Sequence, residues 1–124
     1  MTRSALVSLL ANVAVVFVAV SHIGFLILEM FLWDHPVGRK IFQMTPEQSK
    51  FSATLAANQG LYNGFLAAGL LWGLGSNNLE FKLFFLICVV VAGLYGGFTA
   101  NRTIWVIQAL PALVALILNY AAFA

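Results

Sequence analysis

The sequence predicts an all-α integral membrane protein, an antiparallel bundle of four transmembrane helices. Hydrophobic residues make up 62% of the 124 positions and charged residues only 8%, against about 25% charged in ordinary soluble domains. A chain this short buries only about 60–70% of the surface it could expose, so much of its apolar surface would stay uncovered. Something other than water must cover that surface. A spanning helix needs about 20 mostly apolar residues, and the charges are spaced so that four such stretches fit into the lipid bilayer.

The four predicted helices use nearly the whole chain, so we expect a single transmembrane domain, 1–124. They run over about 4–33, 46–74, 79–100 and 103–123. The first is not a cleaved signal peptide, because it is too long and because His22 and Glu29 follow where a cleavage site would stand. The single cysteine, Cys88, excludes an intramolecular disulfide.

Turn residues separate the first predicted helix from the second. The run Asp34-His35-Pro36-Val37-Gly38 is expected to end the first helix, because proline and glycine do not easily continue one. The run Thr45-Pro46-Glu47-Gln48 then has the spacing of a capping box, with proline suited to the first helical position. The second helix is therefore expected to begin near Pro46, before its apolar part.

Short links and small residues predict how the other helices pack. Asn78, at the end of the turn 75–78, is a plausible cap for the third helix, and the three-residue link 101–103 makes the third and fourth helices antiparallel neighbours. The runs 60–64 and 93–97 each contain the small-x-x-x-small spacing that lets helix backbones approach closely.

The basic residues favour one orientation in the membrane. Loops 34–50 and 101–103 carry four of them, against two on the other side, which favours these loops as cytoplasmic and both termini as external. There is no basic stripe with interleaved aromatic residues, so a nucleic acid is not an expected partner.

Polar side chains within the predicted spans are the strongest functional signal. Such groups are costly in a bilayer and need partners, so each is by default a candidate for function. The directions of the helices bring most of them towards the side of the 34–50 loop, which predicts a polar pocket. Its candidate residues are His22, Glu29, Asn58, Gln59, Tyr62, Asn63, Tyr95, Thr99 and Gln108.

His22 and Glu29 are the candidate acid–base pair of this pocket. They are seven residues apart, so they share one helix face at a separation of about 10 Å, too far for a direct hydrogen bond. Each candidate residue of the pocket also has a structural explanation that needs no ligand. Glu29 could reach the interface or pair with a basic residue, His22 could bond to Asn63 or a tyrosine, and the amides could simply hold helices together.

Four motifs together point to a known family. They are His22, Phe25, Glu29 and Trp33; the run Asn58-Gln59-Gly60-Leu61-Tyr62-Asn63-Gly64; the run 92–96; and the run 108–112. The set resembles a bacterial family of four-helix membrane proteins catalogued as domain of unknown function 1304. The resemblance covers nearly the whole chain and implies a location in the bacterial inner membrane. It also implies that His22, Glu29, Asn58, Gln59, Tyr62, Asn63, Tyr95 and Gln108 are signature positions, but it carries no activity.

Three classes of function fit these residues. The pocket could bind or transform a small apolar or lipid-like ligand, and whether the chain is an enzyme stays open. Alternatively, the chain could be a small proton-coupled transporter, acting as a homo-oligomer with Glu29 as its titrating group, although the site lies on one side and no inverted repeat is seen. A non-catalytic assembly or interaction protein is the third class. No cofactor or metal is expected, because His22 and Glu29 supply only two ligands.

Overall fold

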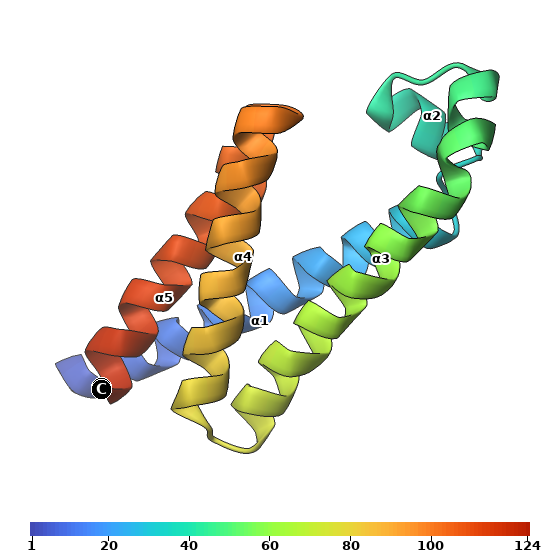
Figure 1. Cartoon of the computed structure of the whole chain (residues 1–124). Helices are drawn as coiled ribbons and strands as arrows, with labels where there is room; N and C mark the ends of the chain where they lie inside the picture. The colour runs from blue at the N-terminus through green and yellow to red at the C-terminus, as the bar shows by residue number, and fades with distance from the viewer. The chain divides into compact units, whose positions relative to one another are not determined.

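The computed structural model describes all 124 residues and is entirely helical (Figure 1). Five α-helices and one π-helical turn follow in the order α1 (Arg3–Met30), α2 (Pro36–Phe42), α3 (Pro46–Gly75), α4 (Leu79–Thr99), η1 (Trp105–Ala109) and α5 (Leu110–Phe123). Three helical segments are long and apolar enough to cross a membrane, namely α1, α4 and the continuous segment Trp105–Phe123. The chain is therefore an all-helical membrane protein, as its composition predicts.

The chain folds as two compact units. Unit 1 comprises Met1–Ala19 and Ala68–Ala124, and unit 2 comprises Val20–Ala67. Unit 1 thus contains the first part of α1, the end of α3, and all of α4, η1 and α5. Unit 2 contains the rest of α1, α2 and most of α3.

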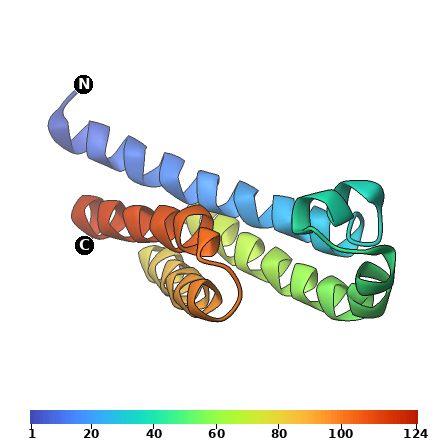
Figure 2. The same ribbon diagram turned by 90° about the horizontal axis from the view of Figure 1, so that it is seen from above.

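Within unit 1, α4 packs tightly against η1 and α5, and Figures 1 and 2 show α4 and α5 side by side. A Cβ atom on Gly93 would lie 2.8 Å from the backbone nitrogen of Ala109, and the indole of Trp105 lies directly over Gly97. The Trp105 Nε1–H group also donates a hydrogen bond to the carbonyl of Leu94 at 3.1 Å. The small-residue spacing in the run 93–97 therefore serves close helix packing, as predicted.

The turn η1 interrupts the helix that the sequence predicts over 103–123. The backbone N–H of Leu110 donates to the carbonyl of Trp105, five residues earlier, which is the π-helical pattern. Pro111 follows directly and has no N–H with which to continue the ordinary α-helical ladder. The wider turn places Gln108 so that its Nε2–H group reaches the carbonyl of Val89 at 3.5 Å.

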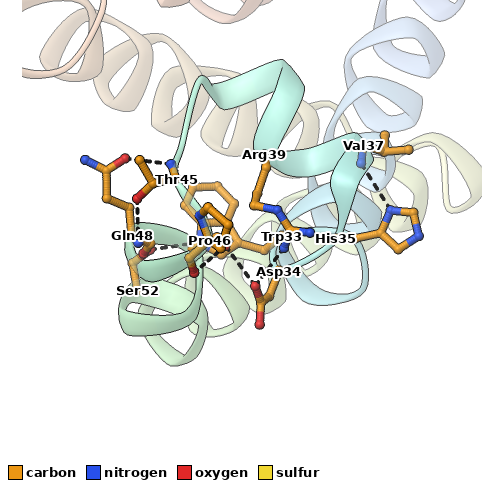
Figure 3. Close-up of polar contacts among 10 residues, drawn as sticks. Trp33, Asp34, His35, Val37, Arg39, Thr45, Pro46, Gln48 and Ser52 are labelled. Atoms are coloured by element: carbon orange, nitrogen blue, oxygen red, sulfur yellow. Dashed lines mark hydrogen bonds and ion pairs between the residues drawn. The ribbon is translucent and has the colours of Figure 1, made fainter.

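Unit 2 contains a helix that the sequence analysis did not predict. The helix α1 ends at Met30, three residues earlier than expected, and α2 begins at Pro36. His35 caps α2, because its Nδ1 atom accepts a hydrogen bond from the Val37 N–H at 3.1 Å (Figure 3). A Cβ atom on Gly38 would collide with the backbone carbonyl of Leu32, so only glycine fits there. The segment 34–38 thus ends one helix and starts another.

The predicted starts of α3 and α4 are confirmed. The Thr45 N–H donates to Gln48 Oε1 at 2.9 Å and the Gln48 N–H donates to Thr45 Oγ1 at 3.1 Å, which completes the capping box before Pro46 (Figure 3). The Asn78 Oδ1 atom accepts a hydrogen bond from the Phe81 N–H at 3.1 Å and caps α4.

Within unit 2, α1 and α3 run antiparallel and close together. A Cβ atom on Gly60 would lie 2.7 Å from Met30 Cγ and 3.0 Å from Glu29 Cβ, and one on Gly64 would lie 2.6 Å from Leu26 Cδ1. Later residues of α3 meet earlier residues of α1, which is the signature of an antiparallel pair. The two glycines therefore bring the α3 backbone against the last turns of α1.

Candidate functional site

The carboxyl group of Glu29 and the side-chain amide of Asn63 form the centre of the candidate site. The Asn63 Nδ2–H group donates a hydrogen bond to Glu29 Oε1 at 2.5 Å. Asn63 is buried at 7% exposure, and Glu29 is half-buried. Asn63 can reach the carboxyl because Gly60 and Gly64 flank it on α3 and allow the two backbones to approach. Sequence reasoning selected both residues but did not pair them.

The second oxygen of Glu29 has different surroundings. No side chain or backbone group of the chain donates a hydrogen bond to Oε2. Glu29 also lies in the last turn of α1, where the negative end of the helix macrodipole disfavours a carboxylate. Neither the Oε2 atom without a donor nor the position of Glu29 in the last turn stabilises α1. The group therefore retains hydrogen-bonding capacity that the fold does not use.

His22 lies two turns before Glu29 on α1 and is almost completely buried, at 1% exposure. Its ring meets the ring of Phe25 edge-on, with centroids 5.1 Å apart. The seven-residue separation from Glu29 corresponds to about 10 Å along the helix. This spacing along one helix is too long for a direct hydrogen bond between the imidazole and the carboxyl group.

The other three candidate residues of α3 do not join the Glu29–Asn63 pair. Asn58 and Gln59 are exposed on the surface of the chain, and Tyr62 is 61% exposed. The Tyr62 ring packs edge-on against Phe65, its neighbour on the same helix, at 5.8 Å. Of the four candidate residues on this helix, only Asn63 is buried and bonds to a residue of α1.

The remaining three candidates belong to unit 1. Tyr95 is 71% exposed, and the Thr99 hydroxyl donates a hydrogen bond to the Tyr95 carbonyl at 2.8 Å within the same helix. Gln108 is half-buried beside Val89. Thr99 therefore satisfies its hydroxyl on its own backbone and needs no partner from elsewhere.

Two buried polar residues of unit 1 were not among the predicted site residues. Asn119 is fully buried, and its Nδ2 group donates to the carbonyls of Ala11 at 3.1 Å and Ala115 at 2.8 Å, the role expected of an amide that holds helices together. Lys82, near the start of α4, is only 2% exposed, and its Nζ atom lies 4.2 Å from the ring centroid of Phe123. That cation–π contact stabilises the buried ammonium.

The cavities of unit 1 do not involve the candidate residues. One apolar groove lies between α4 and α5 and another between α1 and α5, and both are open to the surface. Neither is lined by a predicted site residue, so the polar pocket stays a prediction. No three His, Cys, Asp or Glu side chains gather closely enough to hold a metal ion.

Comparisons with known proteins identify the family of this chain. Residues 16–120 match the model of a family described as "Protein of unknown function (DUF1304)". The chain is 33% identical over 107 residues to the uncharacterized protein YpaA of Lactococcus lactis subsp. lactis (strain IL1403), which covers 83% of this chain and 90% of that protein. No solved structure matches significantly. The chain therefore belongs to the DUF1304 family, as its motifs predict.

Proposed function

We propose that Glu29, Asn63 and His22 line a polar intramembrane site that binds a small apolar or lipid-like ligand. The observation that supports this proposal is the one-sided bonding of Glu29, whose Oε1 atom is held by Asn63 while its Oε2 atom accepts no hydrogen bond from the chain. A ligand that carries a hydroxyl or N–H group on an apolar body would donate to this second oxygen.

The incomplete bonding of this carboxyl group supports a bound donor. Glu29 is half-buried, and a carboxyl oxygen without a donor is unfavourable in an apolar medium. Asn63 donates to only one of its two oxygens. A residue kept for helix stability would sit in the first turn of a helix, where a negative charge is favourable, and not in the last turn.

His22 complements Glu29 as the second member of the acid–base pair. Its imidazole lies about two turns deeper on the same helix, so a ligand of about 10 Å could contact both groups. The exposed side chains of α3 within the same unit would orient such a ligand at its outer end. These are Asn58, Gln59 and Tyr62.

We further propose that α3 is a fourth membrane span and that the whole chain is one transmembrane domain. Its 30 residues correspond to about 45 Å, which exceeds the roughly 30 Å of a hydrocarbon core. It runs antiparallel to the apolar helix α1 at Gly60 and Gly64, so it follows α1 through the same layer. Its polar residues, which include Asn58 and Gln59, explain why it is less apolar than the other three segments.

The test is the set of small molecules that co-purify with the protein. Wild-type protein in lipid nanodiscs is expected to retain a specific lipid-like molecule, identified by mass spectrometry. The Glu29→Gln variant is expected to retain at least about tenfold less, because an amide replaces the carboxyl oxygen that would accept the ligand's hydrogen bond. The control is Glu80→Gln, which removes an exposed carboxylate from the first turn of α4 and should change nothing.

Two results would overturn the proposal. Equal retention by wild type and Glu29→Gln would show that the carboxyl group does not bind the molecule. A proton flux across liposomes that disappears in Glu29→Gln, without any retained molecule, would instead assign the chain to proton-coupled transport.

A further inference from the structure

The segment between α1 and α3 is a rigid structure and not a loose loop. The Asp34 Oδ1 atom accepts hydrogen bonds from Arg39 Nη1 at 3.0 Å and from Ser49 Oγ at 2.8 Å. The Trp33 Nε1–H group donates to Ser52 Oγ at 2.9 Å. Figure 3 shows these side chains gathered under α2, which they tie to the end of α1 and the start of α3. The orientation of α2 is therefore fixed by the fold.

This rigid segment exposes large apolar side chains. Val37 and Ile41 are 45% and 53% exposed, and because they are four residues apart they form one edge of α2. Phe31, just before α2, is 71% exposed, and Phe51, in α3, is 90% exposed. An exposed apolar segment of this kind is typical of an interaction site. It lies directly after Met30, the last residue of a membrane-spanning helix, so it lies close to the bilayer surface.

Unpaired positive charges border this apolar edge. Lys40 and Lys50 are exposed, and no carboxylate of the chain pairs with either of them, whereas Arg39 is engaged by Asp34. Glu47 is the one acidic residue between Pro36 and Lys50. An apolar edge that can enter the acyl boundary, beside lysines that can reach phosphates, is typical of a helix lying in the interface of an anionic membrane.

We propose that α2 and the start of α3 bind the headgroup layer of an anionic phospholipid leaflet. Val37, Ile41 and Phe51 enter the acyl boundary, and Lys40 and Lys50 contact lipid phosphates. A leaflet without net negative charge would not attract the ammonium groups of Lys40 and Lys50. The contact also sets the depth of the carboxyl group of Glu29, because Asp34, which anchors α2, is only five residues away.

The first test measures the depth of α2 in vesicles of phosphatidylglycerol and phosphatidylcholine. Spin labels are placed on the full chain at Ile41→Cys and, as the control, at Gln43→Cys on the opposite side of the helix end, both with Cys88→Ala. The label at position 41 is expected to be relaxed more by oxygen than by a water-soluble nickel complex, and the label at position 43 the reverse. Equal accessibility of both positions to the nickel complex would overturn the proposal.

The second test measures lipid selectivity. Retention of phosphatidylglycerol over phosphatidylcholine by protein released from nanodiscs is expected to fall about fivefold for each of Lys40→Gln and Lys50→Gln. Arg3→Gln, which removes an exposed charge near the N-terminus, is the matched control and should leave the ratio unchanged. The same selectivity for phosphatidylglycerol in wild type and both lysine variants would contradict the proposal. The apolar edge of α2 would then be assigned to binding a protein partner.

Discussion

Glu29 and Asn63 meet because two glycines allow it. An asparagine side chain is short, so its amide can reach a carboxyl on a neighbouring helix only where the backbones approach closely. Gly60 and Gly64 provide that approach on both sides of Asn63. The pairing therefore depends on the absence of side chains at two positions as much as on the two polar groups themselves.

A double-mutant cycle tests the energy of this hydrogen bond. Glu29→Ala, Asn63→Ala and the double variant are compared by the free energy of unfolding in a detergent titration. We expect a coupling energy of about 0.6 kcal/mol, with an upper range of about 1.7 kcal/mol, as for other hydrogen bonds between membrane helices. Additive effects of the two substitutions, with no coupling, would show that the side chains do not interact in the membrane.

The sequence identifies polar residues that need partners but not the partners themselves. Glu29 and Asn63 stand out because polar groups are costly in lipid. Their pairing depends on the rotation of one helix against the other, which helical periodicity within either helix does not determine. For the same reason the exposure of Asn58, Gln59 and Tyr62 could not be predicted from their spacing along α3.

Helix starts are more predictable than helix ends in this chain. The caps at Thr45 and Asn78 follow from local hydrogen bonds between residues a few positions apart, which the sequence displays directly. The helix α2 is not evident from the sequence, because Pro36 and Gly38 predict the end of a helix. Proline also suits the first turn of a helix, and His35 before it supplies an acceptor that can cap one.

The close packing of α4 on η1 gives a prediction at the scale of elements. Gly93→Ala would place a Cβ atom 2.8 Å from the backbone nitrogen of Ala109, and backbone cannot move aside as a flexible side chain can. We expect the Gly93→Ala substitution to lower the free energy of unfolding by about 1–3 kcal/mol, measured in detergent.

Gly24→Ala is the matched control for that substitution. Its new Cβ atom would meet nothing within 4 Å, so this variant should be as stable as wild type or more stable by up to about 1 kcal/mol. A Gly93→Ala variant that unfolds like Gly24→Ala would contradict the close contact between α4 and η1.

At the scale of the whole molecule, the number of spans decides which parts of the chain share a side of the membrane. With four alternating spans, residues 34–50 would lie on the side of the membrane opposite the turn 75–78. Three spans, with α3 outside the hydrocarbon, would put both segments on one side. The positive charges of loops 34–50 and 101–103 favour these loops as cytoplasmic.

Cysteine labelling in intact cells distinguishes these arrangements. In a Cys88→Ala background, Ser76→Cys is expected to react with a membrane-impermeant maleimide added from outside, and Lys50→Cys to react only after the membrane is permeabilised. Labelling of both positions from outside, or of neither, would contradict four alternating spans.

The most direct measurement is an experimental structure of the protein in lipid nanodiscs, examined at the carboxyl group of Glu29. We predict Glu29 Oε1 bonded to Asn63 and non-protein density within about 3.2 Å of Oε2, the distance of a hydrogen bond. A carboxyl group that points outward at bulk lipid or water, or whose second oxygen is bonded to another protein side chain, would contradict a ligand site at this position.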